Sequence, residues 1–266
     1  MDRLQSIKLI VCDLDGTLLH DDKTMDTKIL IVLSKKKIPF TIVSGRNGLQ
    51  VEKYIKALNI ELPYICNNGA DAFIQDRCCY RYYIPQNSLQ LAVQHIQKNK
   101  ISMILNTPKG IYVYGHDPLI KIFSLRSLGL CPIYQNVPLD NEILAKVYKV
   151  VFACEDIEKI ENVSSQIRND CPDVHCIRSE GTGYTITHKH ATKGNGVRWL
   201  LSKLNIQTKD IIAFGDNFND ISMLKEAGVR VAVANAQPMV KCCADYITKT
   251  NNEDGVSYFI EEYLNR

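Results

Sequence analysis

The hydrophobic pattern of the first 70 residues alternates between two kinds of segment. Short apolar runs rich in β-branched residues lie at Ile7–Cys12, Phe40–Val43 and Pro63–Cys66. Between them, Asp26–Lys36 and Leu49–Leu58 carry apolar residues at the spacing of one helix face. Strands that alternate with helices are typical of βαβ units, whose parallel strands form a sheet covered by helices on both faces. The pattern therefore predicts an α/β fold.

The regular alternation stops after residue 70. Ala72–Ile74 and Tyr80–Tyr83 are separated by a short polar stretch, which indicates a β-hairpin. From Pro85 to His188, segments of both kinds mix without regular alternation. The helices predicted there are Leu89–Gln97 and Glu155–Ile167, and the strands are Ser102–Asn106, Ile111–Tyr114, Lys146–Phe152 and Tyr184–Thr187.

The strand–helix alternation returns in the last quarter of the chain. Gly194–Leu204 and Asp220–Ala227 have helical periodicity, and Ile211–Phe214 and Arg230–Val233 are short apolar strands. We therefore predict a Rossmann-like parallel-sheet core formed by residues 1–83 and 189–266. Residues 84–188 are expected to form an inserted α+β domain. Both pieces have the usual size of a domain.

The composition is that of a globular protein. The 266 residues are 45% hydrophobic and 23% charged, and a net charge of +3 without a basic block argues against a nucleic-acid partner. Ten cysteines in a chain of this length, with no CxxC pair, favour reduced thiols over disulfides or a zinc site. A polar N-terminus and the absence of a long apolar run predict a cytoplasmic protein with no signal peptide and no membrane span.

Polar motifs follow the first two predicted strands. Asp13 and Asp15 come after the first, with Gly16 for the sharp turn. Two carboxylates so close at a strand end can serve one reaction centre, one attacking phosphorus and the other handling protons. This sequence also fits an ordinary Asp-Gly turn. Ser44 and Gly45 offer a hydroxyl and a backbone N–H that suit a phosphate oxygen, although Ser-Gly is also a common loop sequence.

Two further motifs lie beyond the inserted segment. Lys193 precedes a predicted helix and can neutralise phosphoryl charge, but a single lysine also fits a solvent-facing position. Asp216 follows the strand that ends at Phe214 and offers a hard oxygen ligand suited to Mg²⁺. Asn219 and Asp220 stand where the next helix begins and also fit as N-caps.

The four motifs gain meaning together, because the carboxyl ends of parallel strands meet at the edge where ligands bind. Phosphoryl transfer uses a nucleophile, a divalent metal ion and cationic or N–H donors for the spread charge of the transition state. All of these are offered at one predicted edge. The sequence therefore favours a magnesium-dependent phosphoryl-transfer enzyme.

The chain resembles the haloacid dehalogenase (HAD) superfamily, and within it the Cof-type phosphatases, whose cap domain is inserted between the second and third motifs. The resemblance runs nearly end to end. It rests on six segments that occur in the same order: Asp13–Leu18, Val43–Arg46, Asn68–Ala70, Lys193-Gly194, Gly215–Asp220 and Asp245–Gly255.

This resemblance implies roles for the motif residues. Asp13 would be the nucleophile and Asp15 the general acid and base. Mg²⁺ would be held by Asp13, the backbone carbonyl of Asp15, and Asp216, with Asp220 in support. The substrate phosphoryl group would be bound by Leu14, Ser44, Gly45, Lys193 and Asn219. We also expect the Asp15 side chain to be free for protons, with its proton affinity raised by nearby Asp13.

The expected reaction is hydrolysis of a small phosphorylated metabolite, such as a sugar phosphate or a phosphorylated cofactor, through an aspartyl-phosphate. A phosphomutase on the same scaffold remains an alternative, as does a non-catalytic sensor of phosphorylated ligands. The intact pair Asp13 and Asp15 argues against the sensor, because a pure binder gains nothing from a nucleophile and would bear two carboxylates that repel each other. The resemblance implies that the inserted domain selects the substrate. The sequence leaves the substrate and the oligomeric state open, as it does the ranking of four candidate contacts: His116, Lys121, Arg126 and Tyr184.

Overall fold

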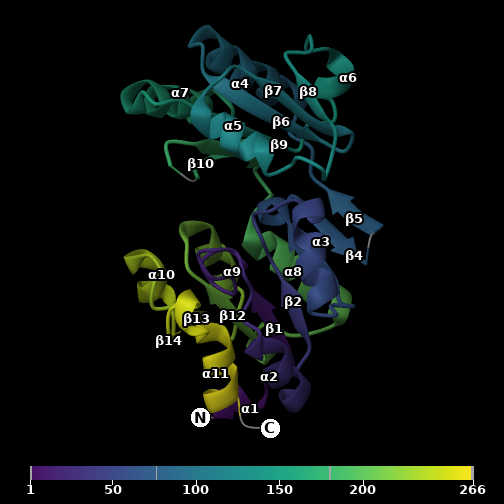
Figure 1. Cartoon of the computed structure of the whole chain (residues 1–266), viewed down its shortest axis with the longest axis vertical. Coiled ribbons are helices and arrows are strands. Elements are labelled where there is room, and N and C mark those ends of the chain that lie inside the picture. Colours follow the sequence, from purple (N-terminus) through teal and green to yellow (C-terminus); the bar gives the residue numbers. More distant parts are fainter. Residues whose placement is uncertain (1, 76, 180, 265–266) are drawn as a thin grey trace. The chain divides into compact units, whose positions relative to one another are not determined.

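The computed structural model describes residues 2–75, 77–179 and 181–264. The chain divides into two compact units (Figure 1). Unit 1 comprises Met1–Tyr80 and Thr192–Arg266, and unit 2 comprises Arg81–Ala191. The sequence placed the two boundaries after residue 83 and before residue 189, whereas the units divide after residue 80 and before residue 192.

A five-stranded parallel sheet forms the centre of unit 1, with the strand order β14-β13-β12-β1-β2. β1 is paired on both sides, with Leu9 opposite Ile211 and Ile10 opposite Phe40. The strands are β1 (Leu9–Cys12), β2 (Phe40–Ile42), β12 (Ile211–Gly215), β13 (Val229–Ala232) and β14 (Tyr246–Ile247).

Helices cover both faces of this sheet because alternate residues of each central strand enter two different hydrophobic clusters. Ile10 and Cys12 of β1 pack in one cluster, with residues of α2, α3 and α11. Leu9 and Val11 pack in the other, with residues of α8, α9 and α10. The helices of unit 1 are α1 (Asp2–Gln5), α2 (Lys28–Lys36), α3 (Gly48–Ala57), α8 (Lys193–Leu204), α9 (Ile221–Lys225), α10 (Pro238–Cys243) and α11 (Gly255–Tyr263).

The third predicted strand differs from the expectation of a single continuous parallel sheet. β3 (Tyr64–Cys66) joins the main sheet through one parallel bridge, between Val43 and Ile65. Its ladder is instead antiparallel to β4 (Asp71–Ile74), in a three-stranded sheet completed by β5 (Arg77–Arg81). The strand turns back because Asn67, Asn68 and Gly69 all have positive φ, which is uncommon outside glycine and asparagine.

Unit 2 is a six-stranded sheet with the order β10-β11-β9-β6-β7-β8, antiparallel except between β7 and β8. One face packs against α4 and α7, and the other packs against Ile120 of α5. The elements are α4 (Gln86–Lys98), β6 (Ser102–Thr107), β7 (Gly110–Tyr114), α5 (Pro118–Leu125), β8 (Ile133–Gln135), α6 (Asn141–Leu144), β9 (Lys149–Ala153), α7 (Ile157–Asp170), β10 (Val174–Arg178) and β11 (Tyr184–His188).

The fold class predicted from the sequence is confirmed: a parallel α/β core accompanied by a largely antiparallel α+β part. All ten cysteines are free thiols. Among the described residues, no helix combines the length and the apolar character that a membrane crossing requires.

Candidate active site

Three of the predicted motifs lie at the carboxyl edge of the central sheet. Asp13 directly follows β1, Ser44 lies two residues beyond β2, and Asp216 directly follows β12. These three strands are neighbours in the sheet, so their ends lie side by side. The loop ends of β2, β1 and β12 thus bring together residues from distant parts of the sequence.

Lys193 joins two of the carboxylates from inside the protein. Its Nζ lies 2.6 Å from Oδ1 of Asp13 and 2.6 Å from Oδ1 of Asp220. The Lys193 side chain is fully buried although it stands in the first turn of α8, where the helix dipole disfavours a cation. Burial alone would lower the pKa of Lys193, but the charges of Asp13 and Asp220 raise it above its ordinary value.

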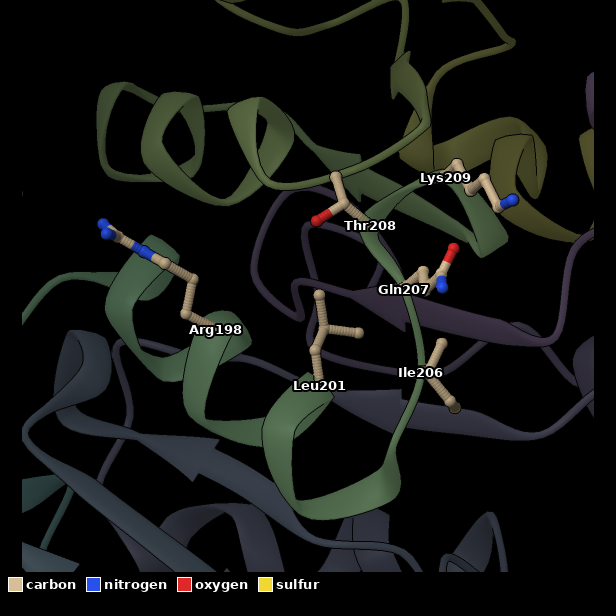
Figure 2. Close-up of a pocket in the computed structure, with 6 residues that line it drawn as sticks. All are labelled: Arg198, Leu201, Ile206, Gln207, Thr208 and Lys209. Atoms are coloured by element: carbon tan, nitrogen blue, oxygen red, sulfur yellow. The ribbon is translucent and has the colours of Figure 1, made fainter.

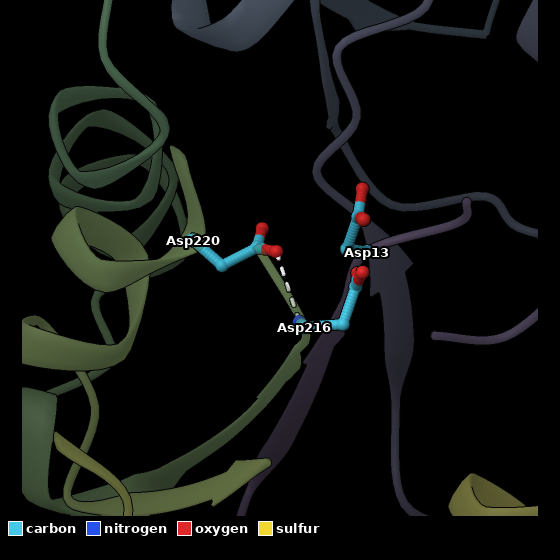
Figure 3. A group of neighbouring side chains, drawn as sticks. All are labelled: Asp13, Asp216 and Asp220. Carbon is cyan, nitrogen blue, oxygen red and sulfur yellow. Dashed lines mark hydrogen bonds between the residues drawn. The ribbon is translucent and has the colours of Figure 1, made fainter. Parts of the chain in front are cut away.

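Asp220 is held by hydrogen bonds on both of its carboxylate oxygens. Oδ1 accepts from Lys193, and Oδ2 accepts from the backbone N–H groups of Asp216 (3.0 Å) and Asn217 (2.9 Å). Figure 3 shows the bond to Asp216 and the carboxylate of Asp216 pointing toward Asp13. Asp220 therefore shapes the loop after β12 and anchors Lys193.

Asp13, Asp216 and Asp220 form a cluster that fits a divalent cation. One carboxylate oxygen from each lies within 4.8 Å of the others. When all three are ionised, three negative charges against the single positive charge of Lys193 leave a net charge of −2. Burial, and then the negative charges of its neighbours, raises the pKa of Asp13 well above its ordinary value, with Lys193 acting against this. Burial and the Asp220 charge raise the pKa of Asp216 to about 6. Hard oxygen ligands that repel one another suit Mg²⁺ or a similar ion.

Gly16 and Thr17 bring Asp216 close to the first motif. The hydroxyl of Thr17 donates a 2.8 Å hydrogen bond to Oδ1 of Asp216. A Cβ at Gly16 would lie 2.6 Å from Oδ2 of Asp216, and Gly16 has a φ of +77°, so a side chain there would be both strained and obstructed. The sequence predicted a turn at Gly16, but it assigned no role to Thr17.

The structure contradicts the expectation for Asp15. Its side chain is 40% exposed and ion-paired instead of free. Nε and Nη2 of Arg46 each donate a 2.6 Å hydrogen bond to one of its oxygens, and Nζ of Lys23 lies 3.0 Å away. Burial would raise the pKa of Asp15, but the hydrogen bonds and charge of Arg46, and then those of Lys23, lower it to about 2. These two cations, and not the repulsion from Asp13 on which the expectation relied, set the direction of the shift in the pKa of Asp15.

The predicted phosphate-binding residues differ in what they present. The Leu14 side chain is fully buried in the core, so Leu14 can offer a ligand only its backbone. The Ser44 hydroxyl accepts a 3.2 Å hydrogen bond from the Arg46 N–H and so keeps its own proton to donate. Asn219 is half-buried, and its Nδ2 donates a 2.8 Å hydrogen bond to Oδ1 of Asn68. Gly45 also lies close to Asn68: a Cβ added at Gly45 would lie 3.0 Å from Oδ1 of Asn68.

The candidate substrate contacts of unit 2 fall into two groups. Tyr184 is buried, with its ring stacked on Phe152 at 5.7 Å, so it packs in the core of that unit. His116, Lys121 and Arg126 are exposed. They remain candidates for contact with a ligand.

A pocket of about 540 Å³ elsewhere in unit 1 has different chemistry (Figure 2). Ile206, Gln207, Thr208 and Lys209, which help to line it, precede β12, so it lies at the amino end of that strand. Its Arg198 is already paired with Glu226 at 3.3 Å. Since ligands of parallel α/β sheets bind at the opposite, carboxyl edge, the carboxylate cluster is the better candidate for the active site.

Comparison with known proteins agrees with this choice. Residues 10–260 match the family model of haloacid dehalogenase-like hydrolases. A Bacillus subtilis protein with a provisional phosphatase name is 31% identical over 274 residues, covering 97% of this chain and 98% of the relative. A second B. subtilis relative, named 5-amino-6-(5-phospho-D-ribitylamino)uracil phosphatase, is 27% identical and covers 97% of this chain and 96% of its own length.

Solved structures give the same result. A haloacid dehalogenase-like hydrolase from Bacteroides thetaiotaomicron superposes with a TM-score of 0.85 at 27% identity, covering 96% of this chain and 98% of that one. Fold and comparisons together define an enzyme of the hydrolase class. The chain belongs to the haloacid dehalogenase-like hydrolase family.

Proposed function

We propose that this protein is a magnesium-dependent phosphatase that hydrolyses a small phosphate monoester through an aspartyl-phosphate on Asp13. The observation that carries the proposal is the Asp13 carboxylate, which directly follows β1 and lies in contact with buried Lys193 and beside Asp216. A carboxylate in this setting is suited to attack phosphorus, because the neighbouring ammonium can offset the charge of the incoming phosphate. The phosphatase names of several relatives support the same class of reaction.

Asp13, the backbone carbonyl of Asp15, and Asp216 would hold the Mg²⁺ ion. The bound ion would neutralise the excess carboxylate charge and polarise the oxygens of the phosphoryl group. Asp220 would support the metal site indirectly, through Lys193 and the loop after β12, since both of its oxygens already accept hydrogen bonds. The identity of the metal rests on the donor set, which consists of hard oxygens.

The proposed reaction has two displacements at phosphorus. An oxygen of Asp13 forms a bond to phosphorus while the ester P–O bond breaks, and Asp15 gives a proton to the departing alcohol. Water then attacks the aspartyl-phosphate, Asp15 takes its proton, and Asp13 is regenerated with release of phosphate. Lys193, Ser44 and the Asn219 amide would hold the phosphoryl oxygens during both steps.

Asp15 as found in this structure is suited to the second of these steps. An ionised carboxylate paired with Arg46 can accept a proton from water. To protonate a leaving group, Asp15 would first have to gain a proton on one oxygen, and Arg46 would then hold only the other. Aryl phosphates, whose alcohol leaves without a proton, are therefore expected to react without prior protonation of Asp15.

Release of inorganic phosphate from a panel of phosphorylated metabolites tests the function. Sugar phosphates, phosphorylated cofactors and 5-amino-6-(5-phospho-D-ribitylamino)uracil should be included, because one relative is named for this last compound. Activity should disappear with a chelator and return with Mg²⁺. Isomerised sugar phosphate without free phosphate would indicate a mutase, and ligand binding without turnover would indicate a sensor. Full activity in metal-free buffer would contradict the metal assignment.

A further inference from the structure

Arg46 holds the Asp15 carboxylate at two points. Nε donates to Oδ2 and Nη2 to Oδ1, each over 2.6 Å. This two-point geometry fixes both the position and the plane of the carboxylate, which a single lysine contact does not do. The Lys23 contact to the same carboxylate is a single 3.0 Å pair from a half-exposed side chain, so it contributes less to the orientation.

Arg46 is itself fixed at both ends. Its backbone N–H donates to Oγ of Ser44 over 3.2 Å, and its carbonyl accepts from the N–H of Asn67 over 2.8 Å. At the other end, Nη1 donates to the hydroxyl of Tyr54 over 3.2 Å. The guanidinium carbon lies 5.3 Å from the centre of the same tyrosine ring, within the range of a cation–π contact.

Tyr54 supplies a rigid support because it is buried in the core. Its side chain, on α3, is only 4% exposed and belongs to the hydrophobic cluster beneath the sheet. Its hydroxyl donates in turn to the carbonyl of Lys23 over 3.3 Å. A chain of contacts therefore runs from the core through Tyr54 and Arg46 to Asp15.

We propose that Arg46, supported by Tyr54, is a positioning residue that orients Asp15 for its proton transfers and does not itself bind the substrate phosphate. Three of the five guanidinium N–H donors are already engaged, two by Asp15 and one by Tyr54. The bidentate pair of Nε and Nη2 is therefore committed to Asp15, and only one N–H on each of Nη1 and Nη2 is left for another acceptor. This inference rests on the proposed phosphatase function.

The proposal predicts which step fails when Arg46 is replaced. A misplaced Asp15 cannot help an alkyl leaving group to depart, so Arg46→Gln should lower kcat for an alkyl phosphate on the order of 100-fold with little change in KM. With an aryl phosphate, the alcohol leaves without an acid, and the slow step becomes attack by water. This substrate should then give a burst of about one aryl alcohol per active site.

A double-mutant cycle with Asp15→Asn separates positioning from phosphate binding. If Arg46 acts through Asp15, adding Arg46→Gln to Asp15→Asn should change the remaining rate by less than about twofold. A further large loss in the double variant, or weaker inhibition by inorganic phosphate in the single variant, would show that Arg46 contacts phosphate and would overturn the proposal. Faster turnover of Arg46→Gln would also overturn it.

Two further variants keep the test independent of folding. Tyr54→Phe removes one hydrogen bond from Arg46 and should lower kcat about fivefold, again more for alkyl than for aryl esters. Arg230→Gln is the matched control, because Arg230 makes a similar two-point contact with Asp245 at 2.7 and 3.0 Å on β13. The control should retain wild-type kinetics. Equal losses of kcat in the Arg46 and Arg230 variants would show that the effect is general destabilisation and would refute the positioning role of Arg46. A wild-type protein inactive on every ester would instead refute the proposed function.

Discussion

The side-chain amide of Asn219 donates a 2.8 Å hydrogen bond to Oδ1 of Asn68, across 151 positions of sequence. Asn68 has a φ of +57° within the turn that follows β3, and its two neighbours in the chain, Asn67 and Gly69, also have positive φ. The bond fixes which face of the Asn219 amide points away from Asn68. If Asn219 binds a phosphoryl oxygen, its hydrogen bond to Asn68 orients the remaining N–H of the Asn219 amide toward that oxygen.

Asn68→Gly tests this relationship without straining the backbone, because glycine tolerates the positive φ. Without its acceptor, the Asn219 amide should rotate freely, and KM for a phosphate ester should rise about fivefold. Steady-state kinetics give KM, and urea denaturation should show near-normal stability. Asn68→Ala is the companion variant, with the same loss of the amide and about 1 kcal/mol of added backbone strain. Unchanged KM in both variants would exclude this role for Asn68.

Replacement of Lys193 by Met should destabilise the protein strongly. The side chain is fully buried between Asp13 and Asp220, so its loss leaves two carboxylates without their cation. We expect the free energy of unfolding to fall by about 3–5 kcal/mol in metal-free buffer. Urea denaturation at neutral pH measures this change, and phosphatase activity should be lost as well.

Lys8→Met is the surface counterpart of that experiment. Lys8 pairs with Asp210 at 2.8 Å, but its side chain is 61% exposed. The expected loss is below about 1 kcal/mol, because water already screens the pair. Similar losses in the two variants would show that the Lys193 bridge carries little of the stability of the unit.

The metal-free protein should lose stability as the pH rises through the range where Asp216 titrates. Its pKa is raised from 3.8 to about 6, so between these values the folded state binds a proton that the unfolded chain has released. The stabilising contribution is therefore complete below pH about 4 and lost as the pH rises past about 6. Urea denaturation in chelator at pH 5 and pH 7.5 should show this fall.

Asp216→Asn should remove the part of that pH dependence that Asp216 contributes, and leave the part contributed by Asp13. Relative to wild type, the unfolding free energy of the variant should rise by about 1.4 kcal/mol between pH 5 and pH 7.5. Mg²⁺ at pH 7.5 should stabilise wild type and have a smaller effect on the variant. Parallel pH profiles for the two proteins would mean that Asp216 is not the group responsible.

The two aspartates of the first motif should fail in different ways. Asp13→Asn lacks the proposed nucleophile and should form no phosphoenzyme with any ester. Asp15→Asn keeps the nucleophile, so an aryl phosphate should give a burst of about one alcohol per site and then very slow turnover. A radioactive phosphate label should remain on the protein and be released by hydroxylamine, which cleaves acyl phosphates. Steady turnover of Asp15→Asn without a burst would contradict its role.

The central strands could be predicted because their burial leaves a plain sequence signal. β1 and β12 are apolar on both faces, because helices cover both faces of the sheet to which they belong. β10 and β8 were missed, because half or more of their residues are exposed and the apolar run is broken. α5 was also missed, although Asp117 as N-cap and a proline in its first turn were visible in the sequence.

The candidate site was predictable where it depends on strand ends, and not where it depends on side-chain direction. Asp13, Ser44 and Asp216 follow their strands, so topology alone brings them together. Arg46 stood in a recognised motif, but nothing in the chain indicated that its guanidinium would reach Asp15, 31 positions away. Tyr54 has the helical spacing of an ordinary core residue, and only its hydroxyl distinguishes it.

The pairing of β1 with β12 has a consequence for synthesis of the chain. Leu9 lies opposite Ile211, so β1 gains this neighbour only after about two hundred more residues have left the ribosome. Unit 2, which is continuous from Arg81 to Ala191, emerges completely before that point. A nascent chain halted before β12 would expose one apolar edge of β1, a surface that chaperones bind and that promotes aggregation. Asp13 and the carboxylates that surround it therefore come together late in biosynthesis.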